Sequence, residues 1–236
     1  MILDAWLKGP ANEHEAVAMN DGADALGRLR LALTAGIKLA LDPNDTQQVF
    51  YLARAAGLAR LPQLKERLST TELGRGLLAE RPAIDRESVD FDALRALPAD
   101  SLGGAYVRML DSKGLTPDIF ERPPGLPEDL AWIGQRLRQT HDLWHLLTGL
   151  ETDVPGEIAL QAFTYGQAQL RLSWLLMVFG VLIFSARHPQ LYWLAKRWHA
   201  RGQHAAFLLE IPWERHWSEP LAKVRADLRI RPVSAA

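Results

Sequence analysis

Cysteine is absent from the 236 residues of this sequence. Its absence excludes disulfide bonds, zinc sites built on thiolates and a thiol nucleophile. Any bound metal must therefore be held by His, Asp or Glu side chains. A chain without cysteine also fits a reducing compartment, in which disulfides rarely persist.

An excess of either charge is also lacking, since 27 Lys and Arg face 28 Asp and Glu. A balanced chain creates no global field that attracts nucleic acid, so no nucleic-acid partner is expected. The first 21 residues have neither the basic flank and apolar core of a secretory signal nor the Arg-rich, acid-poor character of a transit peptide. We therefore expect the protein in the cytoplasm.

Alternating strand patterns with hairpin turns are missing as well. Apolar residues instead recur three and four apart, as in 22–41, which predicts an all-α fold arranged as a layered multi-helix bundle. Residues 1–24 remain unassigned, and residues 25–236 are expected to form a single domain. Further helices are expected in 42–57, ending at Gly57, and in 62–69, 190–210 and 218–230. Another is expected within 69–82, closed by Pro82, and one within 97–114, with Asp100 or Ser101 as its N-cap and Gly114 after its end.

Two longer helices form the centre of this prediction. One starts at Glu128 and runs through residue 148, and the other starts at about Val154 and is stopped by Pro189. Because only a short connection joins them, they are expected to form a long antiparallel pair.

No apolar run reaches the roughly 20 residues that a bilayer-spanning helix needs. Residues 172–186 are fifteen uncharged residues between Arg171 and Arg187. A central core helix is the favoured interpretation over direct membrane contact. The small residues Gly180 and Ser185 leave a third interpretation open, a channel for a long hydrocarbon ligand.

Residues 141–157, HDLWHLLTGLETDVPGE, combine two histidines and four acidic residues with a Pro-Gly break. On a helix, His141 and His145 lie one above the other, and Asp142 lies on the adjoining strip. Gly149 is the expected end of this helix. Three potential metal ligands therefore share one helix edge.

The next helix is expected to begin at Asp153 and Pro155, which leaves a connection of about four residues. Such a connection places Glu157 opposite His145, with each residue about 6 Å from the turn at 1.5 Å rise per residue. Packed helix axes about 8 to 10 Å apart leave room for a metal bridged by both side chains.

Simpler interpretations of these residues stay open. The histidines could be a pair on a polar face, and Asp142 could pair with Arg138 or be held by Gln139. Glu157 could merely stabilise the helix dipole, an effect of about 0.3 to 1 kcal/mol. Trp144 is more readily explained by core packing than by stacking on a ligand.

Other motifs give weaker signals. In HDLWH, Asp142 is shorter than the Glu that acts as base in the HExxH zinc helix of metalloproteases. The His-Asp doublet of nucleotide phosphohydrolases needs further ligands, for which His14 and His188 have no recognisable setting. In PWERHW, Glu214 and Arg215 could form a structural ion pair.

Read as HDxxH, eleven residues and then Glu, the stretch resembles the signature of the coenzyme Q (ubiquinone) biosynthesis protein 4 family, and GEI at 156–158 continues it. The likeness extends, in the expected order, through DPNDTQQVF, ELGRGLLAERP, LPADSLGGAYVRML and PWERHWSEPL. The likeness covers roughly residues 25–230, and the chain resembles a bacterial member of the family. The acidic loop ETDVP and residues 1–24 depart from the family pattern.

The resemblance implies that His141, Asp142, His145 and Glu157 are ligands of a divalent metal and form the catalytic site. Zinc is the usual description, with iron, magnesium or another divalent ion as alternatives. It also implies an enzyme, a lyase that removes the C1 carboxylate from a polyprenylated 4-hydroxybenzoate-type precursor of ubiquinone, coupled in one version to ring hydroxylation.

The implied partners are the polyprenylated quinone precursor, the membrane surface and the other ubiquinone-biosynthesis enzymes, which the protein would help to organise; a homodimer is left open. The implied location is the cytoplasm, in peripheral association with the inner membrane. Two alternatives remain: a non-catalytic prenyl-lipid-binding scaffold with a structural metal, and an HD-like metal-dependent hydrolase.

Overall fold

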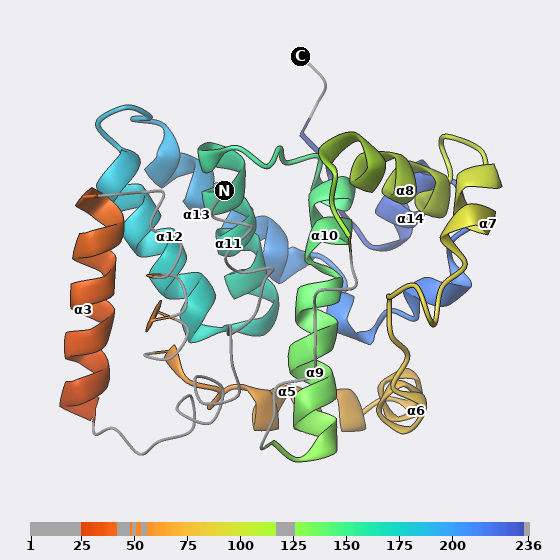
Figure 1. Cartoon of the computed structure of the whole chain (residues 1–236), viewed down its shortest axis with the longest axis horizontal. Coiled ribbons are helices and arrows are strands. Elements are labelled where there is room, and N and C mark those ends of the chain that lie inside the picture. The colour runs from red at the N-terminus through yellow and green to blue at the C-terminus, as the bar shows by residue number, and fades with distance from the viewer. Residues whose placement is uncertain (1–24, 42–47, 49–50, 53–55, 117–125, 234–236) are drawn as a thin grey trace. The chain divides into compact units, whose positions relative to one another are not determined.

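The fold is built from helices, as the sequence predicts (Figure 1). The computed structural model describes residues 25–41, 48, 51–52, 56–116 and 126–233. Within these ranges no β-strand occurs, and the single antiparallel bridge joins Ser101 and Pro220. The all-α class is therefore confirmed. The segment 1–24 and most of the helix expected in 42–57 lie outside the described residues.

The observed helices follow in the order α3 (Ala25–Leu41), α5 (Leu61–Ser69), α6 (Glu72–Glu80), α7 (Phe91–Ala96), α8 (Leu102–Lys113), α9 (Glu128–Gln139), α10 (His141–Thr148), α11 (Val154–Ala168), α12 (Arg171–Phe184), α13 (Leu191–His204) and α14 (Leu221–Asp227). Two short 3₁₀ helices, η3 (Leu208–Glu210) and η4 (Trp213–Arg215), precede α14. The structure confirms the caps predicted for α8. Ser101 Oγ accepts from the Gly104 amide at the start of this helix, and Gly114 ends it in the left-handed conformation.

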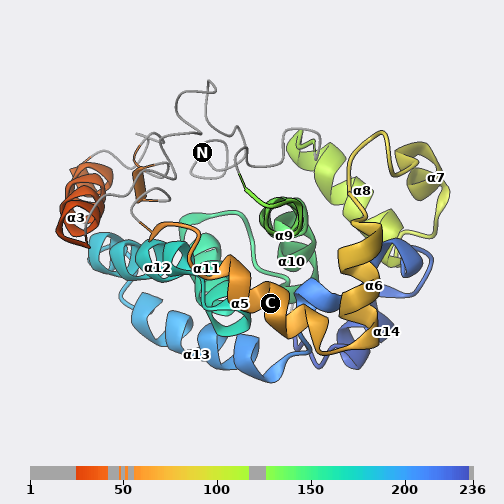
Figure 2. The ribbon, with the colours of Figure 1, turned by 90° about the horizontal axis from the view of Figure 1, so that it is seen from below.

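The chain divides into two compact units, one made of residues 1–61, 123–127 and 151–203, the other of 62–122, 128–150 and 204–236. In the first unit, α12 lies between α3 and α11 (Figure 2). Gly180 permits the approach of α12 to α11, since a Cβ there would come within 2.6 Å of Ile158. In the second unit, α8 contacts α7, α10 and α14. The expected single domain stays a prediction.

The two predicted long helices are both interrupted, so this part of the prediction is wrong. Thr140 separates α9 from α10, and its hydroxyl donates to the Arg136 carbonyl at 2.9 Å, a bond that tends to bend a helix. Gln169 ends α11 in the left-handed conformation, with φ at 52°. The chain then enters α12 at Arg171 and folds back against α11.

The interpretation of residues 172–186 as a central core helix holds only in part. Among the fourteen residues of α12, those buried are Ser173, Gly180 and Phe184. Leu182 exposes 71% of its surface and Trp174 exposes 44%. Partly buried residues of α12 nevertheless pack against two clusters, Leu175 and Phe179 against that of Ala32 and Ala35, and Val181 against that of Ile158 and Leu191. The helix is therefore packed on two sides and exposes some of its apolar side chains.

The expected ion pair between Glu214 and Arg215 does not form. Glu214 instead accepts two bonds from Arg136, whose side chain is completely buried, at 2.5 Å from Nη1 and 3.0 Å from Nη2. Arg136 also donates to the Ile211 carbonyl at 3.1 Å, whereas Arg215 reaches Glu80 only at 3.7 Å on the surface. The buried pair thus ties η4 to α9.

Replacing Glu214 by Ala is expected to lower the free energy of unfolding by about 3 kcal/mol, because it leaves the Arg136 charge buried without its carboxylate. Denaturant unfolding measures this loss. Arg215→Ala is the matched control and should change stability by under about 0.5 kcal/mol. Equal losses in the two variants would show that the Arg136 pair contributes no more than a surface contact.

Candidate metal centre

Helix α10 carries both histidines of the candidate site. His141 and His145 lie on this eight-residue helix, one turn apart, and each exposes 2% of its surface. The helix ends at Gly149, as predicted, where the amide donates to the His145 carbonyl at 2.8 Å. Glycine suits this place because φ is 68°, in the left-handed region that disfavours other residues.

The start of α11 positions the third side chain. Asp153 caps the helix, since its Oδ1 accepts from the Gly156 amide at 2.8 Å, and proline stands in the first turn. Glu157 follows one turn later, and its amide donates to the Asp153 carbonyl at 2.8 Å. The connection from Gly149 to this start is the four residues 150–153, as the sequence predicts.

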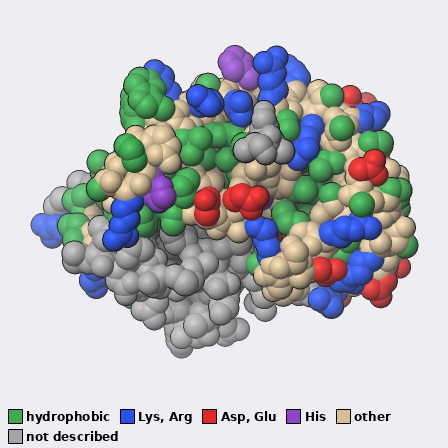
Figure 3. Space-filling model, turned by 90° about the horizontal axis from the view of Figure 1, so that it is seen from above, with side chains coloured by type: hydrophobic (Ala, Val, Ile, Leu, Met, Phe, Trp, Pro, Cys, Tyr) green, Lys and Arg blue, Asp and Glu red, His purple; other side chains and the backbone are tan. Residues whose placement is uncertain are grey.

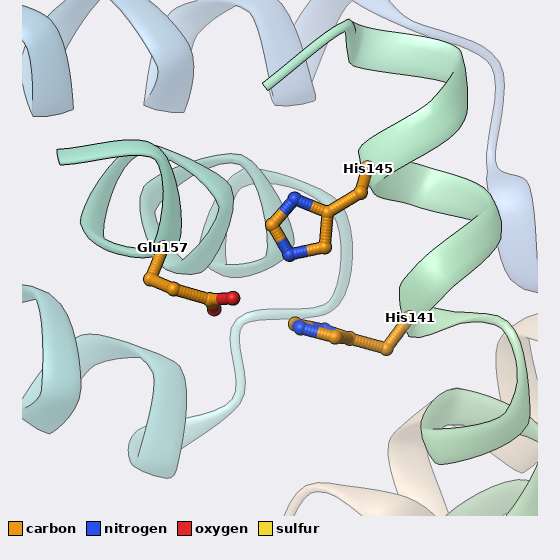
Figure 4. Close-up of side chains that lie close together, drawn as sticks. All are labelled: His141, His145 and Glu157. Atoms are coloured by element: carbon orange, nitrogen blue, oxygen red, sulfur yellow. The ribbon is translucent and has the colours of Figure 1, made fainter. Parts of the chain in front are cut away.

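These elements bring His141, His145 and Glu157 into one buried group (Figure 4). Each residue offers one ligand atom, and the three atoms lie within 4.8 Å of one another. The side chains point toward a common centre. Because bonds from zinc to nitrogen or oxygen are about 2.0 to 2.2 Å long, the group has about the size of one ion's ligand shell.

The orientation of His145 is fixed by a backbone contact that the sequence does not reveal. Its Nδ1 lies 2.9 Å from the carbonyl oxygen of Leu150. Because a carbonyl can only accept, Nδ1 is the protonated nitrogen, and the lone pair is left on Nε2. Metal-binding histidines are typically held in this way through their second nitrogen.

Asp142 is buried, with 3% of its surface exposed, but it does not belong to the group of three. Its role as a fourth ligand stays a prediction. Two neighbours that were considered as its partners also bond elsewhere: Gln139 Oε1 accepts from the Ile84 amide at 3.1 Å, and Arg138 Nε donates to the Gly134 carbonyl at 3.2 Å. Burial lowers the pKa of Arg138 to about 10.

The donor set fits a divalent cation of borderline hardness. Two imidazoles and one carboxylate are ligands that zinc and iron share, and the carboxylate supplies negative charge in a buried place. A buried carboxylate is stable only when its charge is compensated, which a divalent ion would do. Trp144 is fully buried beside the histidines along α10, as core packing predicts.

Comparison with known proteins settles the family. The sequence profile of the coenzyme Q (ubiquinone) biosynthesis protein Coq4 matches residues 22–234. The chain belongs to this family. The match begins close to Ala25, where the likeness seen in the sequence begins, and it places the chain among the proteins of ubiquinone biosynthesis.

Similar proteins of this family include the mitochondrial ubiquinone biosynthesis protein COQ4 homologue of Bos taurus, 33% identical over 211 residues, which cover 86% of this chain and 77% of the relative. The homologue of Xenopus tropicalis is 30% identical over 213 residues, which cover 89% and 75%. A crystal structure of a Nostoc punctiforme protein assigned to ubiquinone biosynthesis has a TM-score of 0.66 at 25% identity, covering 85% of this chain and 97% of that one.

Proposed function

We propose that this protein is a metal-dependent lyase of ubiquinone biosynthesis, which removes the C1 carboxylate from a polyprenylated 4-hydroxybenzoate-type precursor. The observation that carries the proposal is the buried group of His141, His145 and Glu157 in a chain of this family. Zinc is the first candidate for the metal, and iron, magnesium or another divalent ion are the alternatives.

His141, His145 and Glu157 would hold the ion, with Asp142 as the further ligand that the family motif implies. A divalent ion supplies Lewis-acid chemistry that binds and orients a substrate carboxylate. The two imidazoles offer neutral nitrogen donors, and the bond to Leu150 holds His145 in the required tautomer. Because these side chains are buried, water competes little with their interactions.

The departure of CO2 requires electrons from the ring. When the para-hydroxyl is deprotonated, its electrons move toward C1, which accepts a proton there before the bond to the carboxylate breaks and CO2 leaves. In the oxidative version one oxygen atom of O2 adds at C1 in place of the proton and remains there as the hydroxyl after CO2 leaves, while a two-electron donor such as a reduced flavin or nicotinamide reduces the second oxygen atom to water. Glu157, if it stands beside the ion rather than on it, can donate or accept the proton.

The alternatives differ in what the metal does. In a prenyl-lipid-binding scaffold, four protein ligands would close the metal site and leave no position for a substrate. An HD-like hydrolase needs additional His or Asp ligands, and within the described residues the metal-binding group contains no histidine beyond His141 and His145. The hydrolase is therefore the weaker alternative.

Complementation tests the enzyme. A ubiquinone-deficient bacterium that lacks its own C1-decarboxylating protein should regain ubiquinone when it expresses this chain. With an inactive variant it should accumulate a prenylated precursor that retains the C1 carboxylate. Normal ubiquinone with the site removed, or accumulation of an already decarboxylated ring, would contradict the lyase.

Membrane association is the second part of the proposal. The protein would lie at the cytoplasmic face of the inner membrane, next to other ubiquinone-biosynthesis enzymes. There it would contact its lipid-tailed substrate. Among the described residues, no helix is long and apolar enough to cross a bilayer. Peripheral docking therefore needs an exposed apolar surface. The proposal also includes association of two copies of the chain as a homodimer.

Exposed apolar side chains on α12 and α13 offer such a surface. Leu182 exposes 71% of its surface, Trp193 64% and Tyr192 57%. From 158 to 209 the sequence has no acidic residue, and its basic residues are Arg171, Arg187, Lys196, Arg197 and Arg201. On the face drawn in Figure 3, hydrophobic side chains lie among Lys and Arg, with a few Asp and Glu between them. Aromatic and basic side chains together suit the headgroup region of an anionic bilayer.

The protein is expected to float with liposomes that contain anionic lipid and to be released by alkaline carbonate or mild detergent. Joint replacement of Tyr192 and Trp193 by Ser should reduce the partition coefficient at least about tenfold, because each aromatic side chain contributes over 1.4 kcal/mol when buried. The matched control is Leu73→Ser, which removes an apolar side chain of α6 that exposes 53% of its surface. Unchanged flotation of the double variant would contradict this surface.

A further inference from the structure

The C-terminal part of the chain holds the end of the metal-ligand helix α10. Arg225, on α14, donates from Nη2 to the Leu146 carbonyl at 2.8 Å and from Nε to the Leu147 carbonyl at 3.0 Å. These carbonyls lie in the last turn of α10, where a helix has no partners of its own for them. A guanidinium there also places positive charge at the negative end of the helix dipole.

The remaining carbonyls of that turn are bonded too. The Thr148 carbonyl accepts from the Val233 amide at 2.8 Å, and the His145 carbonyl accepts from Gly149. The tail at 231–233 lies close against the turn, since a Cβ on Gly149 would meet Pro232 Cβ and the Val233 nitrogen at 3.4 Å. Each of the last four carbonyls of α10 therefore has a donor, and residues 225–233 supply the donors for three of these carbonyls.

These bonds to the end of α10 are linked to the His145 imidazole through further hydrogen bonds between side chains and the backbone. Thr148 Oγ1 accepts from the Leu150 amide at 3.4 Å and donates to the Trp144 carbonyl at 2.7 Å. Leu150 in turn offers the carbonyl that fixes His145 Nδ1. A shift of the last turn of α10 would therefore move both the helix position of His145 and the acceptor of its ring.

We propose that Arg225 and the tail at 231–233 are positioning elements for the metal centre, which keep His145 Nε2 aimed at the group. The inference rests on the proposed metal site. Arg225 does not touch the ligand atoms, so its effect passes through the turn at 148–150. Lysine at 225 would keep the charge but could not reach both carbonyls in the same fork geometry.

Cobalt(II) titration of the full-length, metal-free protein tests the inference, with the visible ligand-field spectrum as signature. Arg225→Gln is expected to weaken cobalt affinity about tenfold or more, the low end of the range for residues that support a metal ligand. Arg225→Lys should fall between this variant and the original protein. Deletion of 231–236, which removes the Val233 bond, should weaken affinity in the same direction.

Two controls separate positioning from loss of stability. Lys223→Ala changes an exposed residue of the same helix, which pairs with Glu219 and Asp227, and should leave affinity unchanged. Leu94→Ala makes a cavity in the core near α8 and should lower the melting temperature while leaving affinity and spectrum unchanged.

The outcomes are distinct. If the unmodified protein gives no ligand-field spectrum, the proposed metal site is wrong. If it binds cobalt and Arg225→Gln binds it equally well with the same spectrum, the metal site stands and the positioning role is wrong. If Leu94→Ala weakens affinity as much as Arg225→Gln, the effect is one of general stability, and the positioning role is again wrong.

Discussion

His145→Ala is expected to abolish stoichiometric binding of a divalent metal and to lower the melting temperature. The change removes one of the three ligands, and metal that binds only the folded chain stabilises it by about 4 kcal/mol at a thousandfold excess over Kd. For a chain of this size, that loss corresponds to a fall of roughly 10 °C. Elemental analysis and thermal unfolding measure the two effects.

Chelation provides the control for this variant. Removal of metal from the unmodified protein should lower its melting temperature by a similar amount, whereas the same treatment should leave His145→Ala unchanged. His199→Ala changes a histidine of α13 that stacks on Tyr165 and should keep its metal. Unchanged metal stoichiometry in His145→Ala would contradict the assignment of this histidine as a ligand.

Glu157→Gln is expected to weaken metal binding and to abolish decarboxylation in the complementation assay. The amide is nearly the same size, and the Asp153 cap that starts α11 remains, so the local fold is retained. What changes is the negative charge in a buried group with two neutral imidazoles. If Glu157 acted only on the helix dipole, the variant would lower the free energy of unfolding by under about 1 kcal/mol and keep full activity.

The two readouts of Glu157→Gln together define its role. Lost activity with normal metal content would make Glu157 a proton-transfer group beside the metal. Full complementation with normal metal content would remove Glu157 from the site. Glu151→Gln is the matched control, because it removes an exposed carboxylate from the same connection and should change neither readout.

The arrangement of the candidate site was predictable because its determinants are local. Gly149 ends one helix, Asp153 and Pro155 begin the next, and the number of residues between them fixes the place of Glu157 relative to His145. Such caps depend on backbone conformation and side-chain hydrogen bonds within a few residues. The sequence therefore predicts these caps directly.

The breaks in the longer helices were not predictable in the same way. Thr140 and Gln169 are tolerated inside helices, and Gln169 adopts its left-handed conformation where glycine would be the usual signal. Whether a helix breaks at such a residue depends on tertiary packing. The apolar pattern of α12 likewise fits a core helix as well as a surface helix, because it has no polar face to distinguish them.

Partners distant in the sequence were missed for a different reason. The pairing of Arg136 with Glu214, and that of Arg225 with the carbonyls of α10, join residues 78 or 79 positions apart. The acceptor of His145 is a backbone carbonyl, which every residue has. Neither kind of contact leaves a spacing pattern in one sequence.

Release of labelled CO2 tests the central claim most directly. A prenylated 4-hydroxybenzoate-type precursor labelled in its C1 carboxylate would be added to membranes of the ubiquinone-deficient strain, together with purified protein carrying its metal. We expect labelled CO2 with the metal-bound protein, loss of that release after chelation with recovery when metal is restored, and none with His145→Ala. A metal-bound, folded protein that leaves the label on the ring, or equal release by the metal-free protein, would contradict the account.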